Sequence, residues 1–297
     1  MKHILIIAAL AASVFSMEAL VPAAWLQAKT GDKNLVIVDI SDREVYEKEG
    51  HISSAVHTTI EEWRSNNGTF LAVRPAAEIE KVMRKMGIDN DSTVVIYSRI
   101  QTPKDFLKTS YLYWVMKYYG LENVGLLDGG LNQWIREKRA VTTALPTPES
   151  GSFAAKADPA RVADRAYVAS RIGKTPMIDA RPPEFYFGIE NSPGVKRSGH
   201  IEGAMSYFWK YSVDAEYRLK TPEELASLFA DGLGLKKEKE VIVYCTGGLE
   251  TSYNYFVLSG VLGYTNVKLY DASMKEWGNR DDTPMRRHVW EMHQNIK

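Results

Sequence analysis

A single cysteine, Cys245, is the residue of this chain best suited to nucleophilic chemistry. It stands in "EVIVYCTGGLETSYNYF", residues 240–256, directly after an apolar strand-like run and just before a glycine pair. Glycine lets backbone N–H groups turn inward, and N–H groups at the start of a helix attract anions and favour thiolate over thiol. The sequence therefore predicts a nucleophilic cysteine on an anion-binding loop, and a buried cysteine without a chemical role is the alternative. The other residues expected in this loop are Thr246, Gly247, Gly248, Leu249, Glu250 and Thr251.

The elements that would position this loop occur twice along the chain. Residues 36–63 resemble 176–209, 92–98 resemble 239–245, 109–120 resemble 251–263, and 123–134 resemble 266–277. Such self-similarity in the same order indicates two copies of one structural unit. The segment 146–159, "PTPESGSFAAKADP", is rich in Pro, Ser and Ala and is typical of a linker. We therefore predict domains at 20–145 and 160–297.

Each half alternates short apolar runs with helical patterns. The runs "LVIVDI", "TVVIYS" and "VGLLD" are continuous rather than alternating, which is typical of parallel strands covered by helices on both faces. Helices are predicted at 74–87 and 221–232, with Thr221 as the N-cap of the second. The predicted fold class is α/β, with two domains that each contain a parallel sheet flanked by helices. Chemistry in such sheets lies beyond the C-terminal ends of the strands, where Cys245 is expected.

The balance of charges narrows the range of partners. The 297-residue chain carries 37 Lys and Arg against 37 Asp and Glu, a formal net charge of zero. A neutral chain is poorly suited to nucleic acid as its main partner. The histidines show no spacing typical of metal ligands, so we expect neither a metal nor an organic cofactor.

The N-terminus, "MKHILIIAALAASVFSMEAL", follows the order of a secretory signal peptide. A basic start precedes an apolar run at 4–15 and small residues near Ser16 and Ala19. We predict a signal peptide at 1–19, export to the periplasm, and no stable membrane insertion after cleavage. An uncleaved membrane anchor and a hydrophobic first helix are the alternatives, although the run is short for a membrane span. Export would make a lone cysteine more informative, because exported proteins mostly use cysteines in pairs.

Several motifs together resemble the tandem-domain rhodaneses, a sulfurtransferase family of the thiosulfate and 3-mercaptopyruvate type. They are "VDISDREVYEKEGHI" and "IDARPPEFY…SGHIEGA" after the first strand of each half, "VIVYCTGG" as the active-site loop, and "LLDGGLNQW". The resemblance implies two rhodanese-like domains, of which the C-terminal one is catalytic and the N-terminal one is not. In agreement, Ser98 occupies the position that matches Cys245. Ten residues separate Ser98 from Thr109, against five between Cys245 and Thr251, which predicts a first loop too long to form the same cradle.

The resemblance also implies a two-step exchange of sulfur. The Cys245 thiolate would take a sulfane sulfur from a donor such as thiosulfate, with mercaptopyruvate as the alternative donor of a sulfur atom, and a thiol, cyanide or a protein acceptor would remove the outer sulfur from the persulfide. A non-enzymatic periplasmic sulfur carrier or binding protein remains as a second hypothesis. A cysteine phosphatase is disfavoured, because "CTGGLETSYNYF" contains no arginine to hold phosphate.

Two arginines are candidates for binding an anionic donor. Arg181, in "DAR", and Arg197, in "KRSGHI", lie on segments that adjoin the active loop in the family. The alternative is a structural ion pair, for example with Asp179. The stretch "PPEFYF" after "DAR" lacks the arginine that the family's donor-binding members carry there, and "CTGGLE" matches neither "CRKGVT" nor "CGSGVT". Because the loop has no basic residue and adds Glu250, thiosulfate is expected to be a poor donor.

Overall fold

The structure, a computed structural model, describes residues 17–292 of the chain. Residues 1–16 of the predicted signal peptide therefore lie outside the described residues. Its last residues lead into the first strand, where the Ala19 carbonyl accepts a hydrogen bond from the Leu126 N–H at 2.7 Å. Within 17–292, no helix has both the length and the apolar character needed to cross a membrane.

Residues 20–136 form the first α/β unit, built on a five-stranded sheet in which every pairing is parallel. In spatial order the strands are β1 (Leu20–Val21), β7 (Val124–Leu127), β6 (Thr93–Tyr97), β2 (Leu35–Asp39) and β3 (Val56–His57). The helices are α1 (Ala23–Lys29), α2 (Ala76–Lys85), α3 (Pro103–Tyr118) and α4 (Gly130–Arg136). The three continuous apolar runs of this half correspond to β2, β6 and β7, as predicted.

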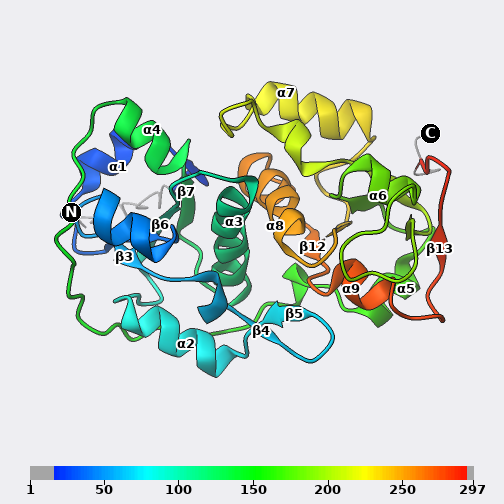
Figure 1. Ribbon diagram of the computed structural model, residues 1–297, viewed down its shortest axis with the longest axis horizontal. Coiled ribbons are helices and arrows are strands. Elements are labelled where there is room, and N and C mark those ends of the chain that lie inside the picture. Colours follow the sequence, from blue (N-terminus) through cyan, green and yellow to red (C-terminus); the bar gives the residue numbers. More distant parts are fainter. Residues whose placement is uncertain (1–16, 293–297) are drawn as a thin grey trace, which may run out of the picture.

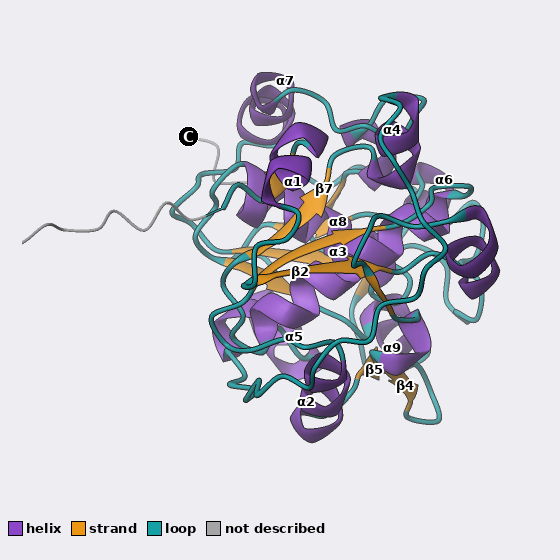
Figure 2. Cartoon of the chain, turned by 90° about the vertical axis from the view of Figure 1, so that its left-hand side faces the viewer, coloured by secondary structure: helices purple, strands orange, loops and turns teal. Residues whose placement is uncertain are grey.

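Both faces of this sheet are covered, which explains why its strands are apolar throughout. Successive strand residues point to opposite faces. Ile37 and Val95 pack in one cluster with residues of α1 and α4, whereas their neighbours Val38 and Val94 pack with residues of α2 and α3. Figure 2 shows the strands between these layers, with α1 and α4 on one side and α2 on the other.

Residues 164–286 form the second α/β unit, whose four-stranded sheet is also parallel. Its strands, in spatial order, are β10 (Ala204–Ser206), β8 (Met177–Asp179), β11 (Val241–Tyr244) and β12 (Val267–Leu269). Its helices are α5 (Arg165–Arg171), α6 (Pro183–Phe187), α7 (Pro222–Ala226), α8 (Leu249–Tyr255) and α9 (Ser273–Trp277). Wider helical turns continue α7 and α8, over Ser227–Gly232 and Phe256–Val261.

Two short antiparallel strand pairs lie outside the two parallel sheets, and Thr221 forms an N-cap. The pairs are β4 (Arg64–Asn66) with β5 (Leu71–Val73), and β9 (His200–Ile201) with β13 (Met285–Arg286). Thr221 caps α7 as predicted, since its Oγ accepts a hydrogen bond from the Glu224 N–H at 3.2 Å. The Glu224 carboxylate accepts in turn from the Thr221 N–H at 3.0 Å.

The two units meet along α3 and α8, which lie side by side at the centre of the molecule (Figure 1). One apolar cluster runs through both units, and the rings of Tyr113 and Phe256 meet edge to face at 5.0 Å. Ser110 Oγ and Ser252 Oγ are hydrogen-bonded across the junction at 2.9 Å. Because α8 begins at Leu249, shortly after Cys245, the N-terminal unit is packed against the helix that follows the cysteine.

Candidate active site

Cys245 lies where the sequence places it, directly after β11 at the carboxyl end of a central strand. The side chain is 1% exposed, and its Sγ accepts hydrogen bonds from the Gly247 N–H at 3.3 Å and the Gly248 N–H at 3.1 Å. We call residues 245–251 the active loop. Backbone N–H groups that converge on a sulfur atom form a small anion-binding concavity.

Helix α9 fixes the outer side of the active loop. The Met274 N–H donates to the Cys245 carbonyl at 3.1 Å, and the Lys275 N–H donates to the Thr246 carbonyl at 2.9 Å. Ser273 Oγ accepts from the Cys245 N–H at 3.0 Å. The first N–H groups of a helix have no partner inside the helix, so α9 can use them to hold the loop carbonyls. With the carbonyls turned outward, the amides of the loop can face the sulfur.

The two loop glycines have different structural roles. Gly248 has φ +95°, and a Cβ atom built on it would collide with Oδ1 of Asp271. Gly247 is outside the left-handed region, and its nearest neighbour would be Lys275 Cδ at 3.4 Å, an ordinary contact. Only Gly248 therefore requires glycine, for both its backbone conformation and its surroundings.

A polar cluster between the two units lies behind the active loop. Asp271, after β12, accepts hydrogen bonds at Oδ2 from the Val73 N–H at 2.8 Å and from the Tyr111 hydroxyl at 3.0 Å. Arg64 Nη2 lies 3.7 Å from Asp271 Oδ1 and donates to the Gly247 carbonyl at 2.5 Å. Burial raises the pKa of Asp271, although the neighbouring Arg64 cation opposes the shift. The N-terminal unit thus reaches the active loop directly.

The resting thiol is protonated at neutral pH. Burial, together with the Glu250 carboxylate, raises the pKa of Cys245 to about 11, although hydrogen-bond donors of Thr251 and Gly247 oppose the shift. The prediction that the loop favours thiolate over thiol is confirmed for the effect of the loop itself, but the net pKa of the resting thiol is raised. The loop N–H groups act in the predicted direction, but the loss of water around the sulfur outweighs them.

Glu250 adds a titratable carboxyl beside the sulfur. Burial and the Asp179 carboxylate raise the pKa of Glu250 to about 7, against the lowering effect of Arg181. Near neutral pH the charge next to Cys245 therefore changes with small changes in pH. Thr246, Gly247, Leu249 and Glu250 are partly exposed, so they form the rim through which a donor must approach.

The structure places both candidate arginines in hydrogen bonds with other groups of the C-terminal unit. Arg181 is 1% exposed, and its Nε lies 2.9 Å from Asp179 Oδ1, which is the ion pair considered as the alternative. It also donates to Ser192 Oγ and to the Gly199 carbonyl. Arg197 donates to the Trp277 carbonyl at 2.9 Å and the Thr283 carbonyl at 3.0 Å, so its guanidinium holds the C-terminal segment.

Two basic residues that sequence reasoning missed also adjoin the active loop. Arg64 arrives from β4 of the other unit, and no local pattern predicts that contact. Lys275 lies on α9, and its aliphatic stem covers Gly247. The only sequence signal for Lys275 was its position in "DASMKEW", two residues before the repeated tryptophan.

The predicted inactivity of the N-terminal unit is based on a long first loop, and the structure contradicts that length. β6 ends at Tyr97 and α3 begins at Pro103, which leaves residues 98–102 as the connection, against 245–248 between β11 and α8. The ten residues between Ser98 and Thr109 do not form a long loop, because most of them belong to the first turns of α3. The difference between the two connections lies in their hydrogen bonds rather than in their length.

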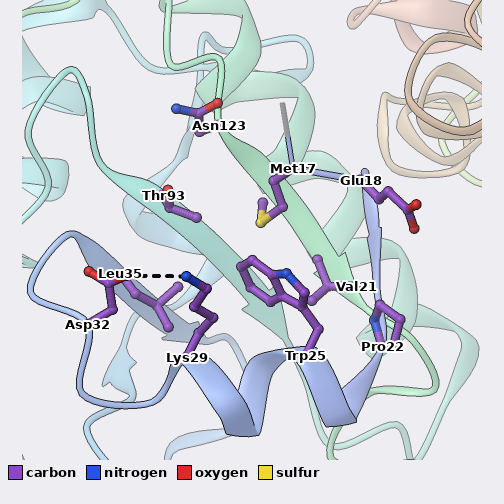
Figure 3. Close-up of a pocket in the computed structure, with 10 residues that line it drawn as sticks. All are labelled: Met17, Glu18, Val21, Pro22, Trp25, Lys29, Asp32, Leu35, Thr93 and Asn123. Atoms are coloured by element: carbon purple, nitrogen blue, oxygen red, sulfur yellow. Dashed lines mark ion pairs between the residues drawn. The ribbon is translucent and has the colours of Figure 1, made fainter. Parts of the chain in front are cut away.

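A cavity of about 560 Å³ lies at the amino-terminal ends of the strands of the first sheet (Figure 3). Leu35 and Thr93, the first residues of β2 and β6, line it together with Asn123, just before β7. Trp25 also lines it, and Lys29 pairs there with Asp32 at 3.9 Å. Active sites of parallel sheets lie at the carboxyl ends of strands, so this cavity is not a candidate for the reaction at Cys245. Among the described residues, no group of three or more His, Cys, Asp or Glu could hold a metal ion.

Comparison with known proteins agrees with this geometry. A family model for the rhodanese-like domain matches the chain twice, over residues 22–137 and 164–280. The chain therefore belongs to the rhodanese-like family and contains two such domains in tandem.

The relatives of similar length include two from different organisms. The chain is 32% identical over 286 residues to the sulfur carrier protein TtuD of Thermus thermophilus, and the match covers 91% of this chain and 97% of that protein. A relative in Haloferax volcanii, provisionally named a thiosulfate sulfurtransferase, is also 32% identical, over 93% of this chain and 98% of its own length.

Solved structures share the fold. The 3-mercaptopyruvate sulfotransferase SseA of Escherichia coli superposes with a TM-score of 0.73 at 28% identity, covering 86% of this chain and 99% of that chain. An anaerobic ergothioneine biosynthesis enzyme from Chlorobium limicola has a TM-score of 0.79 at 21% identity, over 91% of this chain and 70% of that one. The second similarity concerns the fold alone.

Proposed function

We propose that this protein is a sulfurtransferase that carries sulfane sulfur as a persulfide on Cys245. The convergence of the Gly247 and Gly248 N–H groups on Cys245 Sγ is the observation that carries the proposal. Relatives named for sulfur carriage or thiosulfate sulfur transfer, at 32% identity over nearly the whole chain, support the same chemistry.

The reaction divides into two balanced displacements. The Cys245 thiol first loses its proton to water, and the thiolate attacks the outer sulfur of thiosulfate. A new sulfur–sulfur bond forms while the bond to the sulfonate sulfur breaks, and sulfite leaves with that electron pair. Cyanide or a thiolate then attacks the outer sulfur of the persulfide, and Cys245 leaves as thiolate. The charge is conserved in both steps, and no metal or redox partner is required.

Charged side chains at the rim of the active loop affect which sulfur donor can approach Cys245. Glu250 brings a carboxylate above about pH 7, whereas Lys275 places a cationic side chain along Gly247. Thiosulfate carries two negative charges and mercaptopyruvate carries one, so repulsion by Glu250 opposes thiosulfate more strongly. This balance supports thiosulfate as a slow donor and mercaptopyruvate as an alternative donor.

An enzyme and a sulfur carrier differ in turnover. With cyanide as the acceptor, an enzyme releases many equivalents of thiocyanate per chain from a suitable donor. A carrier becomes loaded once and delivers its sulfur only to a specific protein acceptor. A thiocyanate assay with thiosulfate and with mercaptopyruvate, using Cys245→Ala as the control, separates the two. Release that stops at one equivalent with every donor would favour the carrier.

We also propose that the chain is exported to the periplasm after cleavage near residue 19. The order of charged, apolar and small residues supports cleavage there. β1 begins at Leu20, so a chain cleaved after Ala19 keeps this edge strand. Fractionation of native cells and N-terminal sequencing test the proposal, and a cytoplasmic protein that begins at Met1 would contradict it.

A further inference from the structure

Three consecutive carbonyl groups of the active loop are held from outside. The Cys245 and Thr246 carbonyls accept hydrogen bonds from the backbone of α9, at 3.1 Å and 2.9 Å. The Gly247 carbonyl accepts from the Arg64 guanidinium, which belongs to the N-terminal domain, at 2.5 Å. Two of the three anchors are therefore local to the catalytic domain, and the third crosses the domain boundary.

The third anchor acts on the peptide that contacts the sulfur most closely. The peptide between Gly247 and Gly248 presents its C=O to Arg64 and its N–H to Cys245 Sγ, at 3.1 Å. In a trans peptide these two groups point in opposite directions, so holding the carbonyl fixes the direction of the N–H. Glycines on both sides leave this peptide free to rotate unless another group holds it.

Arg64 is itself a fixed group. Its side chain is 6% exposed, it donates to the Leu71 carbonyl at 2.9 Å, and its guanidinium lies 4.6 Å from the centre of the Tyr111 ring. Asp271 supplies a carboxylate at 3.7 Å. Nη2 alone donates to both the Leu71 and the Gly247 carbonyl, so a single guanidinium nitrogen joins β5 to the active loop.

We propose that Arg64 of the N-terminal domain is a positioning residue for the reaction at Cys245, because it holds the Gly247–Gly248 peptide with its N–H directed at the sulfur. The consequence for turnover rests on the proposed function, whereas the effect on the thiol does not. If the peptide rotated, its carbonyl oxygen would face the sulfur and repel a thiolate or a persulfide anion. The N-terminal domain then contributes to the catalytic loop, in addition to providing a surface for packing.

Two variants test this role while preserving the local net charge. Arg64→Lys keeps a cation near Asp271, but the shorter lysine side chain ends before the position of Nη2 and loses the hydrogen bond to the Gly247 carbonyl. The double variant Arg64→Met with Asp271→Asn removes the cation and the anion together, so that no buried charge is left unpaired. Ser110→Ala is the matched control, because it removes another interdomain hydrogen bond, to Ser252, and leaves the Arg64 contact with Gly247 in place.

The primary measurement is the rate of alkylation of Cys245 by iodoacetamide as a function of pH. Below the thiol pKa this rate follows the thiolate fraction. We therefore expect the rate to fall about fivefold in both Arg64 variants, which corresponds to a loss of about 1 kcal/mol in the stabilisation of the thiolate. At every pH well below the thiol pKa of about 11 the ratio to wild type should stay the same, because both rates then rise with the thiolate fraction. Ser110→Ala should follow the wild-type profile throughout.

The persulfide gives a second measurement. After loading with a sulfane donor, both Arg64 variants should lose the added sulfur several-fold faster than Ser110→Ala, as followed by mass spectrometry. Alkylation requires no donor, so it reports on Arg64 even if no persulfide forms and the proposed function fails. A wild-type alkylation profile in either folded Arg64 variant would overturn the proposal. If neither variant folds while Ser110→Ala does, Arg64 is a stability residue and the proposal is equally overturned.

Discussion

The connection 98–102 after β6 and the connection 245–248 after β11 occupy matching places in the two sheets. Their first carbonyl groups have equivalent partners, because the Leu131 N–H donates to the Ser98 carbonyl at 3.0 Å as the Met274 N–H does to Cys245 at 3.1 Å. The tyrosines that end the two strands are also equivalent. Tyr97 accepts from the Ile52 N–H at 3.0 Å, and Tyr244 accepts from the Ile201 N–H at 3.1 Å.

The amides of the two connections differ. In the first, the Arg99 N–H donates to Ser41 Oγ at 2.8 Å and the Ile100 N–H donates to Asn132 Oδ1 at 2.8 Å. In the second, the Gly247 and Gly248 N–H groups donate to Cys245 Sγ. Side chains therefore occupy the first set of amides, and only the second set is directed at a reactive atom. An anion cradle depends on the partners of its N–H groups more than on the length of its loop.

The largest expected effect comes from removing the sulfur itself. Cys245→Ala leaves the loop in place but removes the only thiol of the chain, so sulfur transfer to cyanide should fall at least a thousandfold. Mass spectrometry after treatment with a sulfane donor should show one added sulfur in the wild type, reversed by cyanide, and none in the variant. An unchanged wild-type mass with every donor tested would contradict the persulfide.

Gly248→Ala should disrupt the cradle almost as strongly. Its φ of +95° costs an L-residue about 1–2 kcal/mol, and the collision with Asp271 Oδ1 adds to this, so the free energy of unfolding should fall by roughly 2–4 kcal/mol. Turnover should fall about a hundredfold, the scale of losing one preorganised donor. Denaturant unfolding and a thiocyanate assay measure the two effects.

Two other glycines separate the causes of that loss. Gly263 has a φ of +72° and open space where a Cβ would lie. Gly263→Ala therefore measures the free-energy cost of a positive φ without a steric collision. Gly247→Ala lies outside the left-handed region, so it should change stability by less than about 0.5 kcal/mol. If Gly247→Ala were as damaging as Gly248→Ala, the assignment of different roles to the two glycines would be wrong.

The architecture could be predicted from the sequence, because the patterns that indicate strands and helices are local. Continuous apolar runs indicated buried parallel strands, and the position of Cys245 after one of them located the loop. The contacts that distinguish the two connections are not local. Arg64 meets Gly247 across 183 residues of sequence, and Ser41 meets Arg99 across 58. The high pKa of Cys245 also depends on burial by the whole fold, whereas loop residues alone suggested the opposite direction.

Glu250→Gln should have a moderate effect that depends on pH. The pKa of Glu250 is about 7, so the wild-type side chain is neutral below that pH, like glutamine, and anionic above it. The kcat/KM for thiosulfate in the variant should therefore match the wild type near pH 6. Above pH 8 it should be about fivefold higher, because one repelling charge worth on the order of 1 kcal/mol is removed.

Added salt is the control for this charge effect. The gain should shrink as ionic strength rises, because the rim is partly exposed. Equal turnover of the two proteins at pH 8 and low salt would show that Glu250 does not limit this donor.

The smallest expected effect comes from moving the cysteine to the other domain, because this change should not restore turnover. Ser98→Cys on the Cys245→Ala background places a thiol at the matching strand end, where Ser98 is 0% exposed. Its neighbouring amides remain bonded to Ser41 and Asn132, so the new thiol gains a buried site without the donors that hold a persulfide anion. Turnover should stay below about 1% of wild type, since each missing donor costs roughly a hundredfold. Adding Ser41→Ala to release the Arg99 amide should change this little, because Asn132 still holds the Ile100 amide. Substantial thiocyanate formation by the Ser98→Cys protein would show that a buried strand-end thiol suffices, and that the amides do not distinguish the two domains.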